Sequence, residues 1–88
     1  MTVRARGRVD VAPLRDAFLR SRLSASEVCV WLEWHTRTGR PDTNRFMRAL
    51  GLVANTTHGQ RVRARSIGVD RAALIADALG VDPWEIGI

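Results

Sequence analysis

The 88-residue sequence predicts one mainly α domain of four to five short helices, with a small β-hairpin or basic loop after the third helix. Apolar residues recur at helical spacing in several short runs, and helix-start and helix-stop residues bound those runs. One stretch near residue 60 changes to a two-residue period. With 45% hydrophobic residues, the chain is long enough for one core and too short for two. We therefore expect one domain over residues 11–88, preceded by a basic N-terminal arm over residues 1–10.

A first helix is predicted over about residues 11–22, where apolar residues recur at helical spacing. A second helix begins after Ser24, because Ser24 and Glu27 form an S-x-x-E capping box. Cys29 falls on the inner face of this helix, and we expect a buried thiol there rather than a nucleophile. Val30 falls outside that face, where it would pack against another helix or take part in a dimer contact.

A third helix is predicted from about Asp42 to Leu50, after a turn in the stretch HTRTGRP. At 100° per residue its apolar side chains gather on one side. Asn44 and Arg48 point nearly opposite, with Arg45 on a flank. Gly51 is the predicted C-terminal stop. One face of this helix would therefore hold it in the domain and leave the other face free for polar contacts.

The stretch from Val53 to Ile67 reads as a small hairpin or as a mobile loop. Its second half, RVRARSI, alternates Arg61, Arg63 and Arg65 with smaller residues, which is typical of a strand with a basic face. Its first half, LVANTTHGQ, supplies a partner strand and a turn at the dipeptide HG.

A fourth helix is predicted between a cap at Asp70 and a stop at Gly80, with Leu74 among its inward residues. A last short helix follows, since DPWE supplies a cap, a first-turn proline and a second capping box. The tryptophans lie at or beside predicted core faces, and we expect them to be core residues rather than stacking platforms. They are Trp31, Trp34 and Trp84.

The charge of the chain is basic overall and unevenly distributed. Fourteen arginines, without a lysine, stand against nine acids, for a net charge of +5. Residues 36–68 hold seven arginines and one acid, a net of +6, whereas residues 69–88 hold one arginine and four acids, a net of −3. Such segregation favours an anionic partner over a merely solvated basic surface.

Several functional classes are disfavoured by the sequence. No stretch is long and apolar enough to cross a membrane, and the N-terminus lacks a signal peptide, so we expect a cytoplasmic protein away from membranes. One cysteine and two histidines show no metal-ligand spacing, and we expect no metal and no cofactor. No nucleophile and base are paired, and no glycine-rich phosphate loop precedes a helix. We therefore expect no enzyme and no small-molecule substrate.

The sequence resembles a known family in two places. RLSASEVCVWLEW resembles the second helix of XRE or Cro/cI-type helix-turn-helix repressors, and LIADALGVDPWEI resembles their closing helices. Together with RPDTNRFMRALGL and the basic hairpin, the chain resembles small DNA-binding proteins of actinobacterial phages, immunity repressors and Cro-like proteins among them. The turn before the third helix is longer than in that family. The insertion over residues 53–67 has no counterpart in its commonest members; it would be a wing on the DNA backbone or an edge strand for self-association.

This resemblance implies a helix-turn-helix domain that regulates transcription by occupying a double-stranded DNA operator, with the third helix in the major groove. Because Asn bridges adenine edges and Arg bridges guanine edges, the base contacts would come from Thr43, Asn44, Arg45 and Arg48. Backbone contacts would come from Ser24, Ser26, Arg37, Arg40, Arg61, Arg63 and Arg65, with Ser24 serving first as a structural cap. Arg4, Arg6 and Arg8 would form a minor-groove arm or a frayed tail.

Two alternatives to an operator-binding regulator stay open. One is an excisionase-like architectural factor that bends DNA and uses the hairpin as a wing. The other is an antitoxin-like interaction module whose protein partner would contact Val30 and the acidic closing segment. The sequence also leaves the choice between a monomer and a homodimer undecided, because no heptad or long apolar edge demands self-association.

Overall fold

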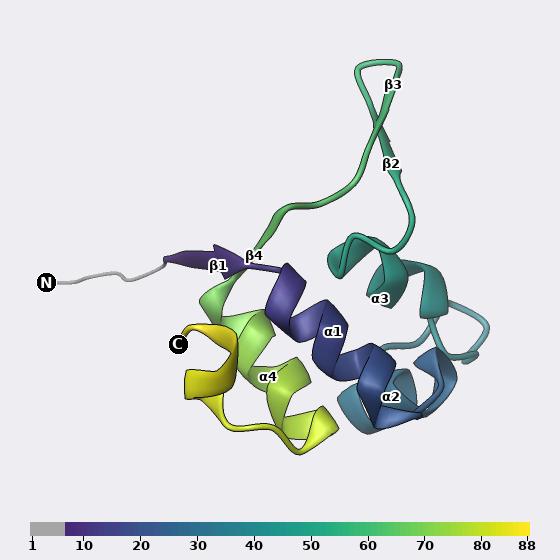
Figure 1. The fold of residues 1–88 in the computed structure, drawn as a ribbon. Coiled ribbons are helices and arrows are strands. Elements are labelled where there is room, and N and C mark those ends of the chain that lie inside the picture. Colours follow the sequence, from purple (N-terminus) through teal and green to yellow (C-terminus); the bar gives the residue numbers. More distant parts are fainter. Residues whose placement is uncertain (1–6) are drawn as a thin grey trace, which may run out of the picture.

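The computed structural model describes residues 7–88, and its helices form one body from which a β-hairpin projects (Figure 1). The domain is mainly α, as predicted, with two two-stranded antiparallel sheets, β1–β4 and β2–β3. In chain order the elements are β1 (Arg8–Asp10), α1 (Ala12–Ser21), α2 (Ala25–Leu32), α3 (Thr43–Ala49), β2 (Asn55–Thr57), β3 (Gln60–Val62), β4 (Ser66–Gly68), α4 (Val69–Leu79) and the 3-10 helix η1 (Pro83–Ile86).

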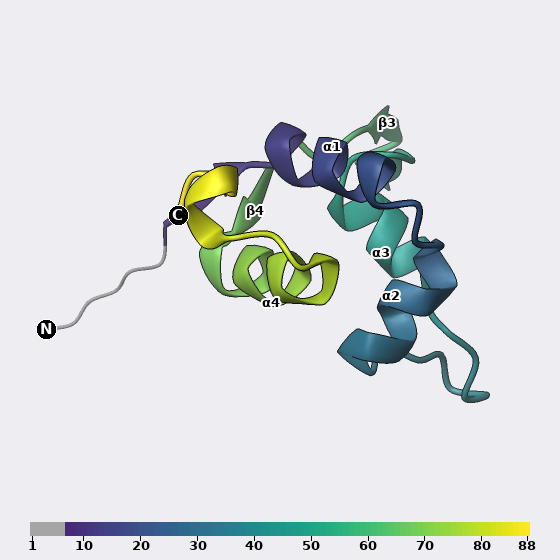
Figure 2. The ribbon, with the colours of Figure 1, turned by 60° about the horizontal axis from the view of Figure 1, so that its bottom comes forward.

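One hydrophobic core joins all the helices. Phe46 of α3 is fully buried in it, and the centroid of its ring lies 4.9 Å from that of Phe18 and 6.4 Å from that of Trp34, with both pairs edge-on. The edge-on arrangement suits the charge distribution of aromatic rings. In Figure 2, α1 lies across the domain, with η1 and α4 toward one end and α3 and α2 toward the other. The other large side chains without exposure are Leu14, Leu50 and Ile75.

Capping residues set the starts of α2 and α3, and the capping box of α2 is the one that the sequence predicts. The Ser24 hydroxyl accepts a hydrogen bond from the Glu27 backbone N–H at 3.1 Å, and the Glu27 carboxylate accepts one from the Ser24 backbone N–H at 2.8 Å. The backbone N–H of Ser24 first, and its side chain second, lower the pKa of Glu27. Asp42 caps α3, since its carboxylate accepts from the Arg45 backbone N–H at 3.2 Å.

The expected hairpin is present. β2 pairs antiparallel with β3, Asn55 opposite Val62 and Thr57 opposite Gln60. The two residues between the strands both have positive φ, 51° at His58 and 78° at Gly59, as a type I′ turn requires. The basic strand is shorter than predicted, because β3 ends at Val62 and the chain stays irregular until β4 begins.

Residues 8–10, which the sequence assigns to a basic arm, form β1 and are part of the domain. β1 pairs with β4 in register, Arg8 opposite Gly68, Val9 opposite Ile67 and Asp10 opposite Ser66. Val9 also packs against the core. The expectation of an arm over residues 1–10 is therefore wrong for residues 8–10, whereas Arg4 and Arg6 lie outside the described residues.

The fourth helix differs from the prediction at its start and on one face. Gly68 is its N-cap, and Asp70 lies in its first turn rather than at its cap, because β4 passes directly into α4. Leu74 is 55% exposed rather than inward. The inner face is formed by Ala72, Ile75 and Ala76, and Leu74 lies 100° from Ile75 on the side away from Ala76.

Two of the three tryptophans are not core residues. Trp34 is buried, but Trp31 is 63% and Trp84 is 74% exposed. Trp31 follows Cys29 by two positions, which places it about 160° around α2 from that buried side chain. Trp84 precedes the buried Ile86 by two positions in a helix with three residues per turn, so it points away from the core.

Within residues 7–88, no helix has the length and apolarity needed to cross a bilayer.

Gly51 should tolerate no side chain, since it has φ +74° and a Cβ there would lie 2.5 Å from the Ala64 carbonyl oxygen. We expect Gly51→Ala to lower the free energy of unfolding by about 3 kcal/mol, because strain and a backbone clash add. Gly80 is the matched control, with the same φ of +74° and no atom within 4 Å of a built Cβ. Gly80→Ala should cost about 1 kcal/mol. Urea denaturation measures both free energies of unfolding. If Gly51→Ala and Gly80→Ala lowered the free energy of unfolding equally, a close contact between Gly51 and Ala64 would be contradicted.

Ser24→Ala should lower the free energy of unfolding by about 1 kcal/mol through loss of the cap. Because the Ser24 side chain helps to lower the pKa of Glu27, that pKa should rise in the variant. The stability that the Glu27 carboxylate contributes is present above its unfolded-state pKa and is lost as the pH falls through its lowered folded-state pKa. Thermal denaturation and NMR titration measure the two effects. Ser26→Ala, a change of the exposed serine in the first turn of α2, should leave both unchanged.

Candidate nucleic-acid interface

The outward face of α3 carries the polar side chains that the sequence singled out. Phe46 and Leu50 are fully buried and hold the helix in the domain. Asn44, Arg45 and Arg48 are exposed, and Thr43 at the helix start is half-buried. The predicted two-sided character of this helix is therefore confirmed. Its amide and guanidinium groups are available to a partner.

Arg45 is held to one side of this face. Its guanidinium carbon lies 4.1 Å from the centroid of the Trp34 ring, within the range of a cation–π interaction. Because Trp34 itself packs edge-on against Phe46, the position of Arg45 is tied to the core. Asn44 and Arg48 have no such aromatic neighbour among the described residues.

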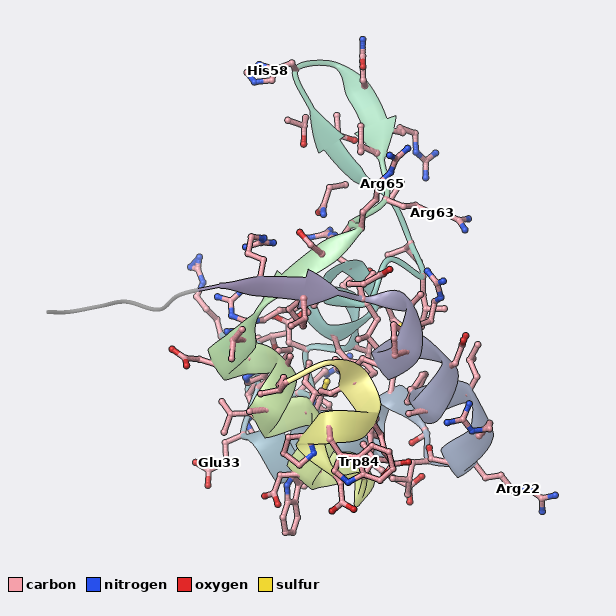
Figure 3. The ribbon with its side chains drawn as sticks, turned by 60° about the vertical axis from the view of Figure 1, so that its left-hand side comes forward. Arg22, Glu33, His58, Arg63, Arg65 and Trp84 are labelled. Atoms are coloured by element: carbon pink, nitrogen blue, oxygen red, sulfur yellow. The ribbon has the colours of Figure 1, made fainter. Side chains whose placement is uncertain are left out.

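The hairpin and the segment after it carry the other predicted arginines. Arg61 is exposed on β3, and Arg63 and Arg65 are exposed in the irregular stretch between β3 and β4. Figure 3 shows Arg63 and Arg65 at the base of the hairpin and His58 at its tip. These arginines therefore cluster where the hairpin leaves the body.

A hollow of about 440 Å³ opens between α3, β4 and the start of α4, and we call it the α3 hollow. Four arginines and one acid, Asp42, line it, for a net charge of +3. Much of the rest of its wall is formed by Trp34, Asn55, Ser66 and Gly68. The four arginines are Arg8, Arg45, Arg48 and Arg71.

The sequence did not predict Arg8 and Arg71 as neighbours of α3. Arg71 is the lone arginine of the acidic closing segment, so the charge distribution along the chain gives no sign of a basic site there. Arg8 reaches the hollow through the β1–β4 pairing, which joins segments 58 residues apart. Its side chain donates two hydrogen bonds to Ser66, from Nε to the hydroxyl at 2.9 Å and from Nη2 to the carbonyl at 3.0 Å.

A second hollow, of about 550 Å³, lies between the start of α1 and the base of the hairpin. It too is lined by four arginines and one acid, which is Asp10. The Asp10 carboxylate accepts a hydrogen bond from the Ala12 backbone N–H at 2.9 Å. Basic groups therefore lie on more than one side of the hairpin base. The arginines here are Arg15, Arg61, Arg63 and Arg65.

Four predicted backbone contacts line neither hollow. Ser24 and Ser26 lie at the start of α2, and the Ser24 side chain and backbone N–H are both engaged in the capping box. Arg37 and Arg40 are exposed in the loop between α2 and α3, which the Thr36 N–H closes by donating to the Arg40 carbonyl at 2.8 Å. The structure thus separates these positions from the cluster around the hairpin base.

Cys29 is fully buried, as the sequence predicts. Its thiol donates to the Asp42 carbonyl oxygen at 3.4 Å, and burial first, then the Asp42 charge, raises its pKa. The thiol therefore stays protonated at neutral pH. Residues 7–88 hold no group of three histidine, cysteine or acidic side chains arranged around a possible metal position.

No protein-family model, curated protein or solved structure matches this chain. Function must therefore be inferred from the exposed polar side chains of α3, the two hollows lined by arginines and the hairpin.

Proposed function

We propose that the protein binds double-stranded DNA sequence-specifically and regulates transcription by occupying an operator. The supporting observation is the exposed polar face of α3 with Asn44 and Arg48, backed by the buried Phe46 and flanked by the α3 hollow. A helix of seven residues is about 10 Å long, and the major groove admits one α-helix. In this proposal α2 and α3 act as a helix-turn-helix pair of the phage repressor or Cro-like kind.

In this proposal, different side chains of α3 contact different groups of the DNA. Asn44 would bridge N6 and N7 of an adenine, and Arg48 would bridge O6 and N7 of a guanine. Thr43 at the start of the helix would touch a thymine methyl or a phosphate. These contacts select the sequence, whereas contacts to phosphate hold the protein in register.

The hairpin is proposed to lie on the DNA backbone as a wing. Arg61, Arg63 and Arg65 are exposed on it or at its base, where guanidinium groups suit phosphate oxygens. The projection of the hairpin from the helical body (Figure 1) also favours a second candidate, an excisionase-like factor that bends DNA. Circular permutation assays distinguish the two, since an architectural factor produces a large bend and a simple operator-binding protein does not.

A third candidate from another class is an antitoxin-like module with a protein partner. The exposed Val30, Trp31 and Trp84 favour it, because aromatic residues are enriched in protein interfaces. Size-exclusion chromatography with and without duplex DNA separates this candidate from the first two. A protein that ignores DNA and elutes with another protein supports the third.

The affinity for DNA should depend steeply on salt. If about six phosphates are neutralised, the logarithm of the association constant falls against the logarithm of salt concentration with a slope of about −5. Fluorescence anisotropy with a labelled duplex at several salt concentrations measures this slope. A slope near zero would count against DNA binding through these arginines.

Arg48→Ala should relax base preference at one position of the site and cost about 1–3 kcal/mol of binding free energy. Arg63→Ala is the matched control, because it removes the same charge from the hairpin base and should weaken binding to all sequences alike. Selection from a randomised duplex library reports both preferences. If the two variants changed base preference equally, α3 would not be the reading element.

A further inference from the structure

We propose that the α3 hollow is an anion site that seats one phosphate of the DNA backbone beside α3, with Arg8, Arg45 and Arg71 as its ligands. This inference rests on the proposed DNA binding and names a contact within it. It assigns Arg45 to a phosphate rather than to a base, and it adds Arg71 to the DNA-binding surface.

Three parts of the chain converge on this hollow. Arg45 comes from α3, and Arg71 comes from the first turns of α4. Arg8 lies on β1 opposite Gly68, the N-cap of α4, so the strand pairing brings its side chain to the start of that helix. The three guanidinium groups thus surround one hollow although they are far apart in sequence.

Two of the three guanidinium groups are already positioned. Arg8 uses Nε and Nη2 on Ser66, which leaves three of its five N–H donors for another acceptor. Arg45 lies over the Trp34 ring at 4.1 Å. Side chains that are ordered before binding lose less conformational entropy when a ligand arrives. The hollow therefore resembles a prepared site more than a group of freely moving surface arginines.

The charge of the hollow also favours an anion. Its single acid, Asp42, accepts the Arg45 backbone N–H as the cap of α3, and the remaining imbalance is +3. The start of α4 borders the hollow, because its N-cap Gly68 lines it, and the helix dipole places a partial positive charge there beside the negative charge of Asp70 in the first turn. A built Cβ at Gly68 meets nothing within 4 Å, so the approach to this wall is open.

The position of the hollow favours a phosphate that belongs to a duplex. Arg48 and Ala49 of α3 form part of its wall, so an anion seated there is adjacent to the face proposed to read bases. A helix in the major groove has backbone phosphates along both of its sides. Free inorganic phosphate has the same chemistry, and the experiment separates the two sources.

The test compares Arg71→Gln and Arg45→Gln with Arg22→Gln, which removes the same charge from an exposed residue at the end of the molecule opposite the hairpin tip (Figure 3). Arg71 is exposed, and circular dichroism melting verifies that each variant is folded. Arg71→Gln and Arg45→Gln should each lower affinity roughly ten-fold for every sequence, with unchanged base preference and a salt slope less steep by about one. Arg22→Gln should bind as the unmodified protein does.

Duplexes with one neutral methylphosphonate at successive positions locate the contact. At one position the neutral group should lower the affinity of the unmodified protein about ten-fold. It should not lower the affinity of Arg71→Gln further, because that variant already lacks the arginine that contacts this phosphate. If both hollow variants bind as Arg22→Gln does, the anion site is wrong. The proposed function would still stand on the altered base preference of Arg48→Ala.

A protein that binds no duplex would overturn the proposed function instead. In that case titration with inorganic phosphate, followed by NMR of the arginine Nε–H groups, decides the inference. Saturable shifts confined to Arg8, Arg45 and Arg71 would show a site for a small free anion and remove the duplex phosphate as its ligand. Absence of shifts would remove the site altogether.

Discussion

The burial of Phe46 is the constraint on which the rest of the structure depends. Its ring meets Phe18 of α1 and Trp34, which follows the C-cap of α2, so one side chain orients three parts of the chain. Because α3 has only seven residues, it has little intrinsic stability and relies on this packing. With Phe46 and Leu50 inward, the geometry of a helix necessarily turns Asn44 and Arg48 outward.

The second organising contact is the pairing of β1 with β4. It ties the start of the described chain to the residues that lead into α4, and Val9 adds to the core. The same pairing carries Arg8 to the hollow beside α3. The short strands β1 and β4 thereby determine that Arg8 lies in the same hollow as Arg45 and Arg71. Eight arginines line the two hollows, whereas Arg22, Glu33 and Trp84 lie at the end of the molecule away from the hairpin tip (Figure 3).

The central arginines have different surroundings although they are one residue type. Arg45 rests on an aromatic ring, Arg8 is bonded to Ser66, and Arg48 is exposed on the outer face of α3. A guanidinium that is already held suits a fixed anion, and one without such a contact among the described residues suits the edge of a base. This difference in surroundings, rather than the charge itself, is what divides the proposed roles.

By itself the sequence determined the features that depend on near neighbours. The capping box at Ser24, the stop at Gly51 and the two-residue hairpin turn are all local, and each was predicted and is present. Tertiary structure decided the pairing of Arg8 with Gly68, the exposure of Trp31, Leu74 and Trp84, and the meeting of Arg8 with Arg71. These outcomes depend on which faces of short helices find partners and on contacts between segments more than fifty residues apart. Local periodicity and capping chemistry contain no information about either.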